Sequence, residues 1–185
     1  MDLGFRMHAE RTPNPNSVKW VLSQALAEGG EGAHFPEPVA EATSPLAARL
    51  FAVDGVAGVF VAGNFVTVTK GEDREWADLA QGVVDAIKAF VASEEPTFGP
   101  DYEAPSERSG DGVAARIRTI LETEVRPAVA QDGGDIIFAG YREGIVEVYL
   151  QGSCAGCPSS TVTLKMGIEA RLREEIPEIQ EVVAL

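Results

Sequence analysis

Apolar and polar positions alternate in several short stretches of the first half of the chain, which is the pattern of β-strands. Strands are predicted over residues 5–10 and 17–22. A second pair, residues 55–62 and 65–69, flanks Gly63-Asn64, a dipeptide typical of a two-residue hairpin turn. The first half therefore begins to assemble a sheet from strands that are close in sequence.

Two helices are predicted around these strands. Ser44 followed by Pro45 favours a helix start, because serine caps free N–H groups and proline fits the first helical position. That helix is expected to run to about Phe51. A longer amphipathic helix, ending near Val91, is predicted by apolar residues three or four positions apart: Trp76, Leu79, Val83, Ile87 and Phe90.

The second half of the chain also combines helices with strands. An apolar stripe over residues 113–121 predicts a helix that Pro127 bends or ends early. Strands over 136–141 and 145–150 are expected to pair as a hairpin, and a short strand over 181–185 closes the chain. Apolar residues at every fourth position predict a helix before that last strand: Leu164, Ile168, Leu172 and Ile176.

Residues 93–110 separate the two halves. This stretch holds three prolines, two glycines and five acidic residues with a single arginine, and it shows no periodic apolar pattern. Such a composition is typical of a solvated linker. The sequence therefore predicts the α+β class, with two small α+β domains at 1–92 and 111–185. Each is expected to pack helices on a small mixed sheet, and the flexible acidic linker 93–110 joins them.

Composition narrows the classes of function. The 185 residues include 15 Lys and Arg against 29 Asp and Glu, a net charge of −14, which repels nucleic acid and anionic membrane surfaces. No apolar run approaches the roughly 20 residues that span a bilayer, and the first ten residues lack the pattern of a targeting segment. Two cysteines cannot form a disulfide framework. We therefore expect no nucleic-acid partner, no membrane partner and a cytoplasmic location.

The two cysteines, Cys154 and Cys157, form a C-x-x-C motif between a predicted strand and a predicted helix. Pro158 at the first helical position would leave Cys157 at or beside the N-cap, where the helix dipole favours a thiolate over a thiol. Gly152 and Gly156 let the backbone wrap closely around whatever the sulfurs hold. The motif is therefore the main candidate for chemistry in this chain.

Three interpretations of the motif are open. In the first, the thiolates supply half of a metal or cluster site, because zinc and iron–sulfur clusters commonly take four ligands and a second copy would then supply the other two. In the second, they are a thiol–disulfide redox pair, although the preceding strand is predicted in a hairpin rather than a βαβ unit. The third interpretation is two small buried residues with no chemistry. Spacing alone does not choose between the metal and redox interpretations.

The segments around the motif resemble a known family. Residues 126–136, 151–160 and 163–169 closely resemble the C-terminal domain of NifU, the Nfu-type iron–sulfur scaffold domain, in a match from about Ala114 to Leu185. The first half is similar to the N-terminal domain of the longer Nfu proteins. That similarity rests on residues 11–16, Lys19, 44–47, 50–51, 55–56 and 65–70.

The resemblance implies a protein that is not an enzyme and that carries a [4Fe–4S] cluster to apo-proteins. It implies that Cys154 and Cys157 are the cluster ligands, two from each chain of a cluster-bridged homodimer. Apo iron–sulfur client proteins and upstream assembly proteins are the implied partners. The additional cysteine-bearing domains of full-length NifU are not found in this sequence, which favours carriage over assembly. A CxxC thiol–disulfide oxidoreductase and a structural zinc dimer are the alternatives.

A second, weaker candidate lies in the first half. Arg11 and Lys19 are basic residues on either side of a proline-rich turn in an otherwise acidic protein. Two interpretations are open: a docking edge for an acidic surface, or a proline-fixed turn whose charges are simply solvated.

Overall fold

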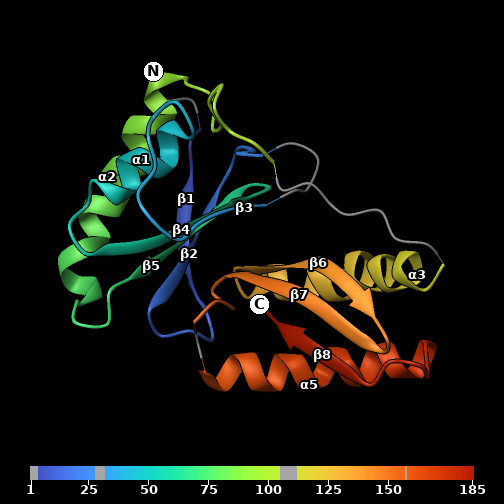
Figure 1. The fold of residues 1–185 in the computed structure, drawn as a ribbon. Coiled ribbons are helices and arrows are strands. Elements are labelled where there is room, and N and C mark those ends of the chain that lie inside the picture. Colours follow the sequence, from blue (N-terminus) through green and yellow to red (C-terminus); the bar gives the residue numbers. More distant parts are fainter. Residues whose placement is uncertain (1–3, 28–31, 105–111, 157) are drawn as a thin grey trace. The chain divides into compact units, whose positions relative to one another are not determined.

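The computed structural model describes residues 4–27, 32–104, 112–156 and 158–185, and the chain divides into two compact units, 1–104 and 105–185 (Figure 1). Each unit packs helices on its own sheet around its own hydrophobic core. The predicted α+β class is therefore confirmed. None of the helices in the described ranges is long and apolar enough to cross a bilayer.

The first unit contains a five-stranded sheet in the order β1-β2-β5-β4-β3. All its ladders are antiparallel, so the mixed sheet expected for this unit is wrong. The hairpin about Gly63-Asn64 is confirmed, whereas β3 is too short to show an alternating pattern in the sequence. The strands are β1 Met7–Arg11, β2 Ser17–Leu22, β3 Ala33–Phe35, β4 Val56–Ala62 and β5 Phe65–Lys70.

Both predicted helices of the first unit are confirmed and cover one face of this sheet (Figure 1). Helix α1 spans Pro45–Phe51, and its cap is the expected one, because Ser44 Oγ accepts a hydrogen bond from Ala47 N at 3.2 Å. Helix α2 spans Trp76–Ser93. Apolar side chains from both helices and the sheet form the core, among them Leu46, Leu50, Val83, Ile87, Val66 and Val68.

The first part of the expected linker is folded onto the first unit. Ser44 Oγ donates to Thr97 O at 2.7 Å, and the rings of Phe98 and Tyr102 stack with centroids 4.3 Å apart against the core. The prediction of a solvated linker relied on the prolines and acidic residues of this stretch. It did not take account of the large apolar area that its two aromatic side chains can bury. Residues 93–104 thus belong to the first unit, and 105–110 lie outside the described residues.

The second unit holds a three-stranded mixed sheet in the order β6-β7-β8. Strands β6, Gly134–Arg142, and β7, Ile145–Gly152, form the predicted hairpin, and β8, Glu181–Ala184, pairs with β7 in parallel. Helix α5, Pro158–Glu175, connects these parallel strands. Strand β7 therefore belongs to a βαβ unit as well as to a hairpin, and the predicted absence of a βαβ unit is wrong.

A bent helix begins the second unit. Helix α3, Val113–Ile120, continues through the π-helical turn η1, Leu121–Val125, into α4, Arg126–Gln131. Proline in a helix lacks an N–H donor and clashes with the carbonyl four residues earlier, and the wider π-helical turn lies directly before Pro127. The predicted bend is thus confirmed, although the helix continues beyond it.

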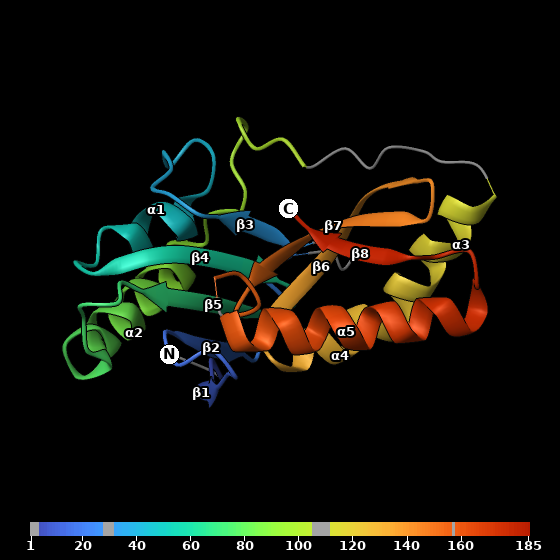
Figure 2. The same cartoon turned by 60° about the horizontal axis from the view of Figure 1, so that its bottom comes forward.

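Helix α5 lies alongside this bent helix (Figure 2). Arg171 of α5 pairs with Glu124 of η1, with Nε 2.6 Å from Oε2. Apolar side chains of both helical segments reach the same core as Ile136, Val146 and Val148 of the sheet. One face of the three-stranded sheet is therefore covered by all the helices of this unit.

A buried ion pair fastens the bent helix to the start of β6. Arg126 Nε and Nη2 each lie 2.8 Å from one oxygen of the Asp135 carboxylate, and Asp135 is buried. Oδ1 of Asp135 also accepts a hydrogen bond from Ile136 N at 2.8 Å. A bidentate pair of this kind fixes geometry as well as adding energy. It holds in place the strand residue that precedes Asp135, which is Gly134.

Replacing Asp135→Asn should lower the free energy of unfolding of the second unit by about 1–3 kcal/mol, because a buried charge-assisted pair is lost. The exposed pair Lys165–Glu181, at 3.0 Å, provides the control, and Glu181→Gln should change the same quantity by at most about 0.5 kcal/mol. Urea unfolding should be followed by hydrogen exchange of β6 and β7 peptides, since Trp20 and Trp76 both lie in the first unit. Equal losses in the two variants would contradict the assignment.

Candidate functional site

Cys154 lies in the loop that connects β7 to α5. Gly152 and Gly156 on either side of it adopt left-handed backbone conformations, with φ of 64° and 73°. Ala155 N donates to Gly152 O at 3.1 Å, which closes a tight turn through Cys154. Glycine adopts these angles without the steric penalty of a side chain. The loop wraps around the cysteine as the glycine spacing predicts.

The sulfur of Cys154 points into the core of its own unit. Only 7% of the residue is exposed, and it packs with the apolar side chains of the second core. Gly134 of β6, which pairs with Gly152 of β7, lies directly beside it. A Cβ atom on Gly134 would come within 2.4 Å of Cys154 Sγ and 3.0 Å of Gln151 O. The missing side chain at position 134 is what makes room for the sulfur.

Gly134 is a site residue that sequence reasoning missed. In the sequence, two adjacent glycines that follow a helix are explained well enough by a helix-ending turn. The structure divides these roles: Gly133 has a positive φ of 76° between α4 and β6, whereas Gly134 is the first residue of strand β6. A turn requires only one glycine, so the second glycine was a signal that another backbone or side chain lies close to this position.

Hydrogen bonds fasten the cysteine loop on both sides. The buried Ser153 donates from Oγ to Asp132 O, and its N–H donates to Gly133 O at 3.2 Å. On the other side, Thr161 Oγ1 of α5 donates to Cys154 O at 3.4 Å. Backbone carbonyls of Asp132 and Gly133 therefore support the cysteine loop.

Cys157, the second predicted ligand, lies outside the described residues. Helix α5 begins at Pro158, as the sequence predicts. Within the ranges that the structure describes, no group of three or more His, Cys, Asp or Glu side chains is arranged to hold a metal ion. The described part of one chain thus offers the Cys154 thiol at this loop and no complete four-ligand centre.

The basic strip of the first unit is only partly available for docking. Lys19 is buried, with Nζ 3.4 Å from Glu10 Oε2 and 4.7 Å from the centroid of the Phe65 ring. A hydrogen bond from His8, together with the charge of Lys19, holds the pKa of the Glu10 carboxyl below its usual value. Arg11 is exposed and lines a cavity of about 510 Å³ beside the proline-rich turn. The predicted docking edge is therefore reduced to Arg11.

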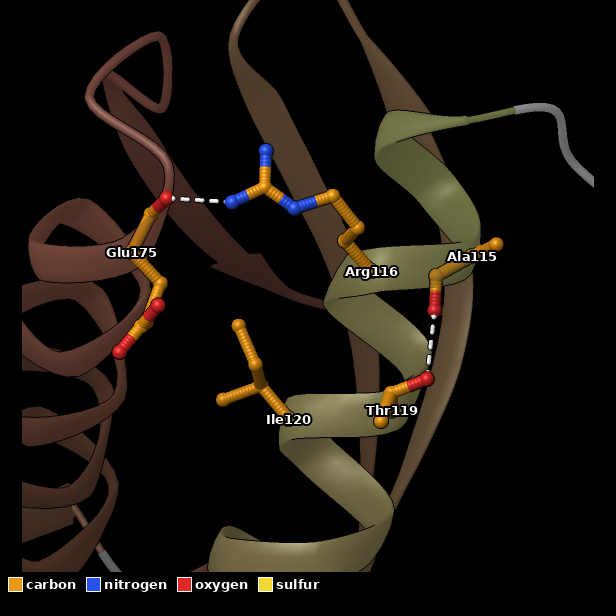
Figure 3. Close-up of a pocket in the computed structure, with 5 residues that line it drawn as sticks. All are labelled: Ala115, Arg116, Thr119, Ile120 and Glu175. Carbon is orange, nitrogen blue, oxygen red and sulfur yellow. Dashed lines mark hydrogen bonds between the residues drawn. The ribbon is translucent and has the colours of Figure 1, made fainter.

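A cavity of about 320 Å³ lies between α3 and the end of α5 (Figure 3). Its polar side chains already have partners. Arg116 Nη2 donates to Glu175 O at 2.7 Å, Thr119 Oγ1 donates to Ala115 O at 3.0 Å, and Glu175 Oε1 accepts from Arg171 Nη1 at 3.2 Å. Its remaining lining residue is Ile120. This set contains neither cysteine nor histidine, so the cysteine loop remains the candidate site.

Two family models match the chain. The model described as "Scaffold protein Nfu/NifU N terminal" matches residues 7–94, and the "NifU-like domain" matches residues 117–183. The first match lies in the first compact unit and the second match lies in the second. The second match also includes the complete C-x-x-C motif.

Sequence similarity to known proteins extends over nearly the whole chain. The human "NFU1 iron-sulfur cluster scaffold homolog, mitochondrial" is 43% identical over 180 residues, which are 95% of this chain and 70% of the human protein. The Drosophila erecta protein of the same name is 39% identical over 95% of this chain, but the chain spans only 63% of its length. The solution structure of a NifU-like protein from Saccharomyces cerevisiae has a TM-score of 0.47 at 19% identity, covering 55% of this chain and 92% of that chain.

The comparison contradicts the cytoplasmic location expected from composition, because the human and fly relatives are named as mitochondrial proteins. The physical reason for the error is that composition is a coarse indicator of compartment. Two cysteines and no spanning segment exclude a disulfide framework and a membrane span, but they do not distinguish one reducing compartment from another.

The burial of Cys154 leads to a labelling prediction for the cluster-free protein. In a Cys157→Ser variant, iodoacetamide should label Cys154 at least about tenfold more slowly in the folded protein than in urea, because the reagent cannot reach a buried sulfur. Adding Gly134→Ala should accelerate labelling of the folded protein, since the new Cβ occupies the space of the sulfur.

Gly140→Ala is the matched control on the same strand, because its Cβ would meet only the end of the Glu147 side chain, at 3.2 Å. Labelling should be measured by mass spectrometry of intact protein. Equal rates in folded and unfolded protein, or equal effects of the two glycine variants, would contradict the placement of the sulfur.

Proposed function

The chain belongs to the Nfu family of iron–sulfur cluster scaffold proteins, and on that premise we propose that it carries a [4Fe–4S] cluster and delivers it to apo-proteins. The cluster is cargo, and the protein is not an enzyme. The observation that carries the proposal is the motif itself: Cys154 and Cys157 are the only cysteines of the 185-residue sequence, and they form a C-x-x-C motif directly before Pro158, where α5 begins.

The ligand count requires two chains. A [4Fe–4S] cluster takes four cysteine thiolates, and each chain has two cysteines. A homodimer with the cluster on its two-fold axis therefore supplies Cys154 and Cys157 twice.

The surroundings of the loop suit a negatively charged cargo. A cubane held by four thiolates carries a charge of about −2, and a helix N-terminus offsets such charge without a dedicated lysine. The start of α5 supplies that dipole beside the motif. This matters in a chain whose net charge is −14.

Loading requires the sulfur of Cys154 to turn out of the space beside Gly134. A cluster shared with a second chain cannot be bonded by a sulfur inside the core of the first. The loop has glycines on both sides of the cysteine, at 152 and 156, where the backbone can absorb the change in φ and ψ. The same loop then serves two states, one with the sulfur in the core and one with the sulfur on the cluster.

Release follows by exchange of ligands. A recipient thiol gives up its proton and bonds to iron, and a carrier thiolate leaves the iron and takes up a proton, so that no electrons are transferred. Separation of the two chains removes two of the four ligands together, which makes a shared site easier to empty than one held within a single chain. Apo iron–sulfur clients, as recipients, and upstream assembly proteins, as donors, are the partners of this cycle.

The two compact units divide the work. We assign the first unit, the Nfu N-terminal-type domain, to holding the client, and the second unit to holding the cluster. The linker between them raises the effective concentration of the bound client near the cluster. Arg11, exposed beside its cavity, is the residue of the first unit that fits an acidic client surface.

One structural observation favours the thiol–disulfide alternative. In the sequence, the C-x-x-C motif directly precedes the helix of a β7-α5-β8 unit, which is also a setting for redox motifs. Such an enzyme needs an accessible reactive thiol. Both this alternative and a structural zinc dimer are therefore outcomes of the test below.

Anaerobic reconstitution with iron and sulfide should produce a brown protein with about four irons per two chains. Cys154→Ala and Cys157→Ala should each abolish cluster binding, because each substitution removes one ligand from both chains and leaves only two of the four. Glu174→Ala, at an exposed position near the far end of α5, should bind iron normally. Visible absorption, iron analysis and native mass spectrometry measure these outcomes.

A colourless protein that binds no iron but reduces disulfides would establish the redox alternative, and a colourless dimer that retains zinc would establish the structural one. Transfer to an apo-recipient should accelerate with recipient concentration. A transfer rate equal to the spontaneous loss of the cluster into buffer would overturn ligand exchange.

A further inference from the structure

Helix α5 is apolar on two sides. Leu164, Ile168 and Leu172 face inward and pack in or against the core of the second unit. Val162 and Met166 face outward, with 59% and 67% of each residue exposed. Residues four positions apart lie on one side of a helix. The helix therefore presents a second apolar surface that its own unit does not cover.

This outward surface is a patch rather than a single exposed residue. Met166 is the most exposed large hydrophobic residue in the described part of the chain. Around it lie exposed small residues, Thr163, Gly167 and Ala170. A Cβ on Gly167 would meet nothing within 4 Å, so the helix backbone is open to close approach there. We refer to these five residues, 162, 163, 166, 167 and 170, as the α5 patch.

Charge is distributed unevenly along the same helix. Residues 158–168 include one charged side chain, Lys165, whereas residues 169–175 include five. Lys165 is neutralised within its unit, because Nζ lies 3.0 Å from Glu181 Oε1. Two copies of a chain with net charge −14 repel one another. The repulsion between two chains is weakest where their facing surfaces carry no charge, as on the part of α5 that follows the cysteines in the sequence.

The position of the patch identifies its occupant. Val162 is the fifth residue of α5, so it lies about 6 Å along the helix axis from Pro158, the residue that follows Cys157 in the sequence. Four thiolates from two chains can reach one cluster only if the starts of the two α5 helices approach each other. A two-fold axis through the cluster places the same surface of each chain against its counterpart. Among the described side chains of α5, the exposed large hydrophobic residues are Val162 and Met166, in the half of the helix that follows the motif.

We propose that the α5 patch is the surface on which a second copy of this chain docks to complete the four-thiolate site. The inference rests on the proposed function and names the interface that function requires. Val162 and Met166 of each copy bury their exposed apolar area against those of the other, and Gly167 and Ala170 let the helices come close.

The test compares three full-length proteins after anaerobic reconstitution. In Met166→Glu, two carboxylates would face each other across the two-fold axis, so the dissociation constant of the cluster-bridged dimer should rise by at least about tenfold. Ile145→Glu makes the same kind of change at an exposed apolar residue of β7, 39% exposed, and should leave the dimer unchanged. Native mass spectrometry measures dimer and cluster together, and circular dichroism confirms folding.

A charge-swap pair keeps the test decisive. Met166→Lys mixed with Met166→Glu should form cluster-bridged heterodimers in excess over either homodimer, because opposite charges then meet at the interface. A Met166→Glu protein that binds its cluster as a dimer with unchanged dissociation constant would overturn the α5 patch while leaving the proposed function intact. The same result with impaired transfer would assign the patch to a client instead. Failure of the unmodified protein to bind iron would overturn the proposed function itself.

Discussion

The close approach of Gly134 to Cys154 organises the second unit. A strand residue without a side chain leaves a space that the sulfur fills, so the loop after β7 is fastened to the start of β6. The buried pair between Arg126 and Asp135 fixes the next residue of β6 to the bent helix. The backbone bond from Ser153 to Gly133 holds the loop from the other direction. Together these contacts fix the position of the loop from which helix α5 begins.

This arrangement bears on how a carrier can both hold and release its cargo. A sulfur that lies in the core when no cluster is bound loses favourable packing when it turns outward. Under the proposed function, that loss opposes loading and favours release, in addition to the effect of sharing four ligands between two chains. An enzyme that keeps its cluster gains nothing from a free-energy cost of cluster binding, whereas a carrier needs such a cost in order to release the cluster. The glycines at 152 and 156 are where the backbone adapts to both states.

Local patterns predicted most helices and strands, because those elements depend on neighbouring residues. The Ser44 cap, the Gly63-Asn64 hairpin and the helices α1, α2 and α5 formed where the sequence places them. The errors arose where pairing or packing involves distant segments. Strand β3 is defined by its partner β4, the parallel pairing of β7 with β8 depends on how α5 packs, and residues 93–104 fold because Phe98 and Tyr102 find a core to cover.

By itself, the sequence determined the C-x-x-C motif, its place before a helix that begins at Pro158, and the count of two cysteines per chain, since residue identity and short spacing suffice for all three. Only the tertiary structure decided that Cys154 points into the core, that Gly134 makes room for it, and that Val162 and Met166 stay exposed while Leu164 and Ile168 do not. Those outcomes depend on contacts between segments about twenty residues apart or more, and such contacts form only when the sheet and the helices pack together.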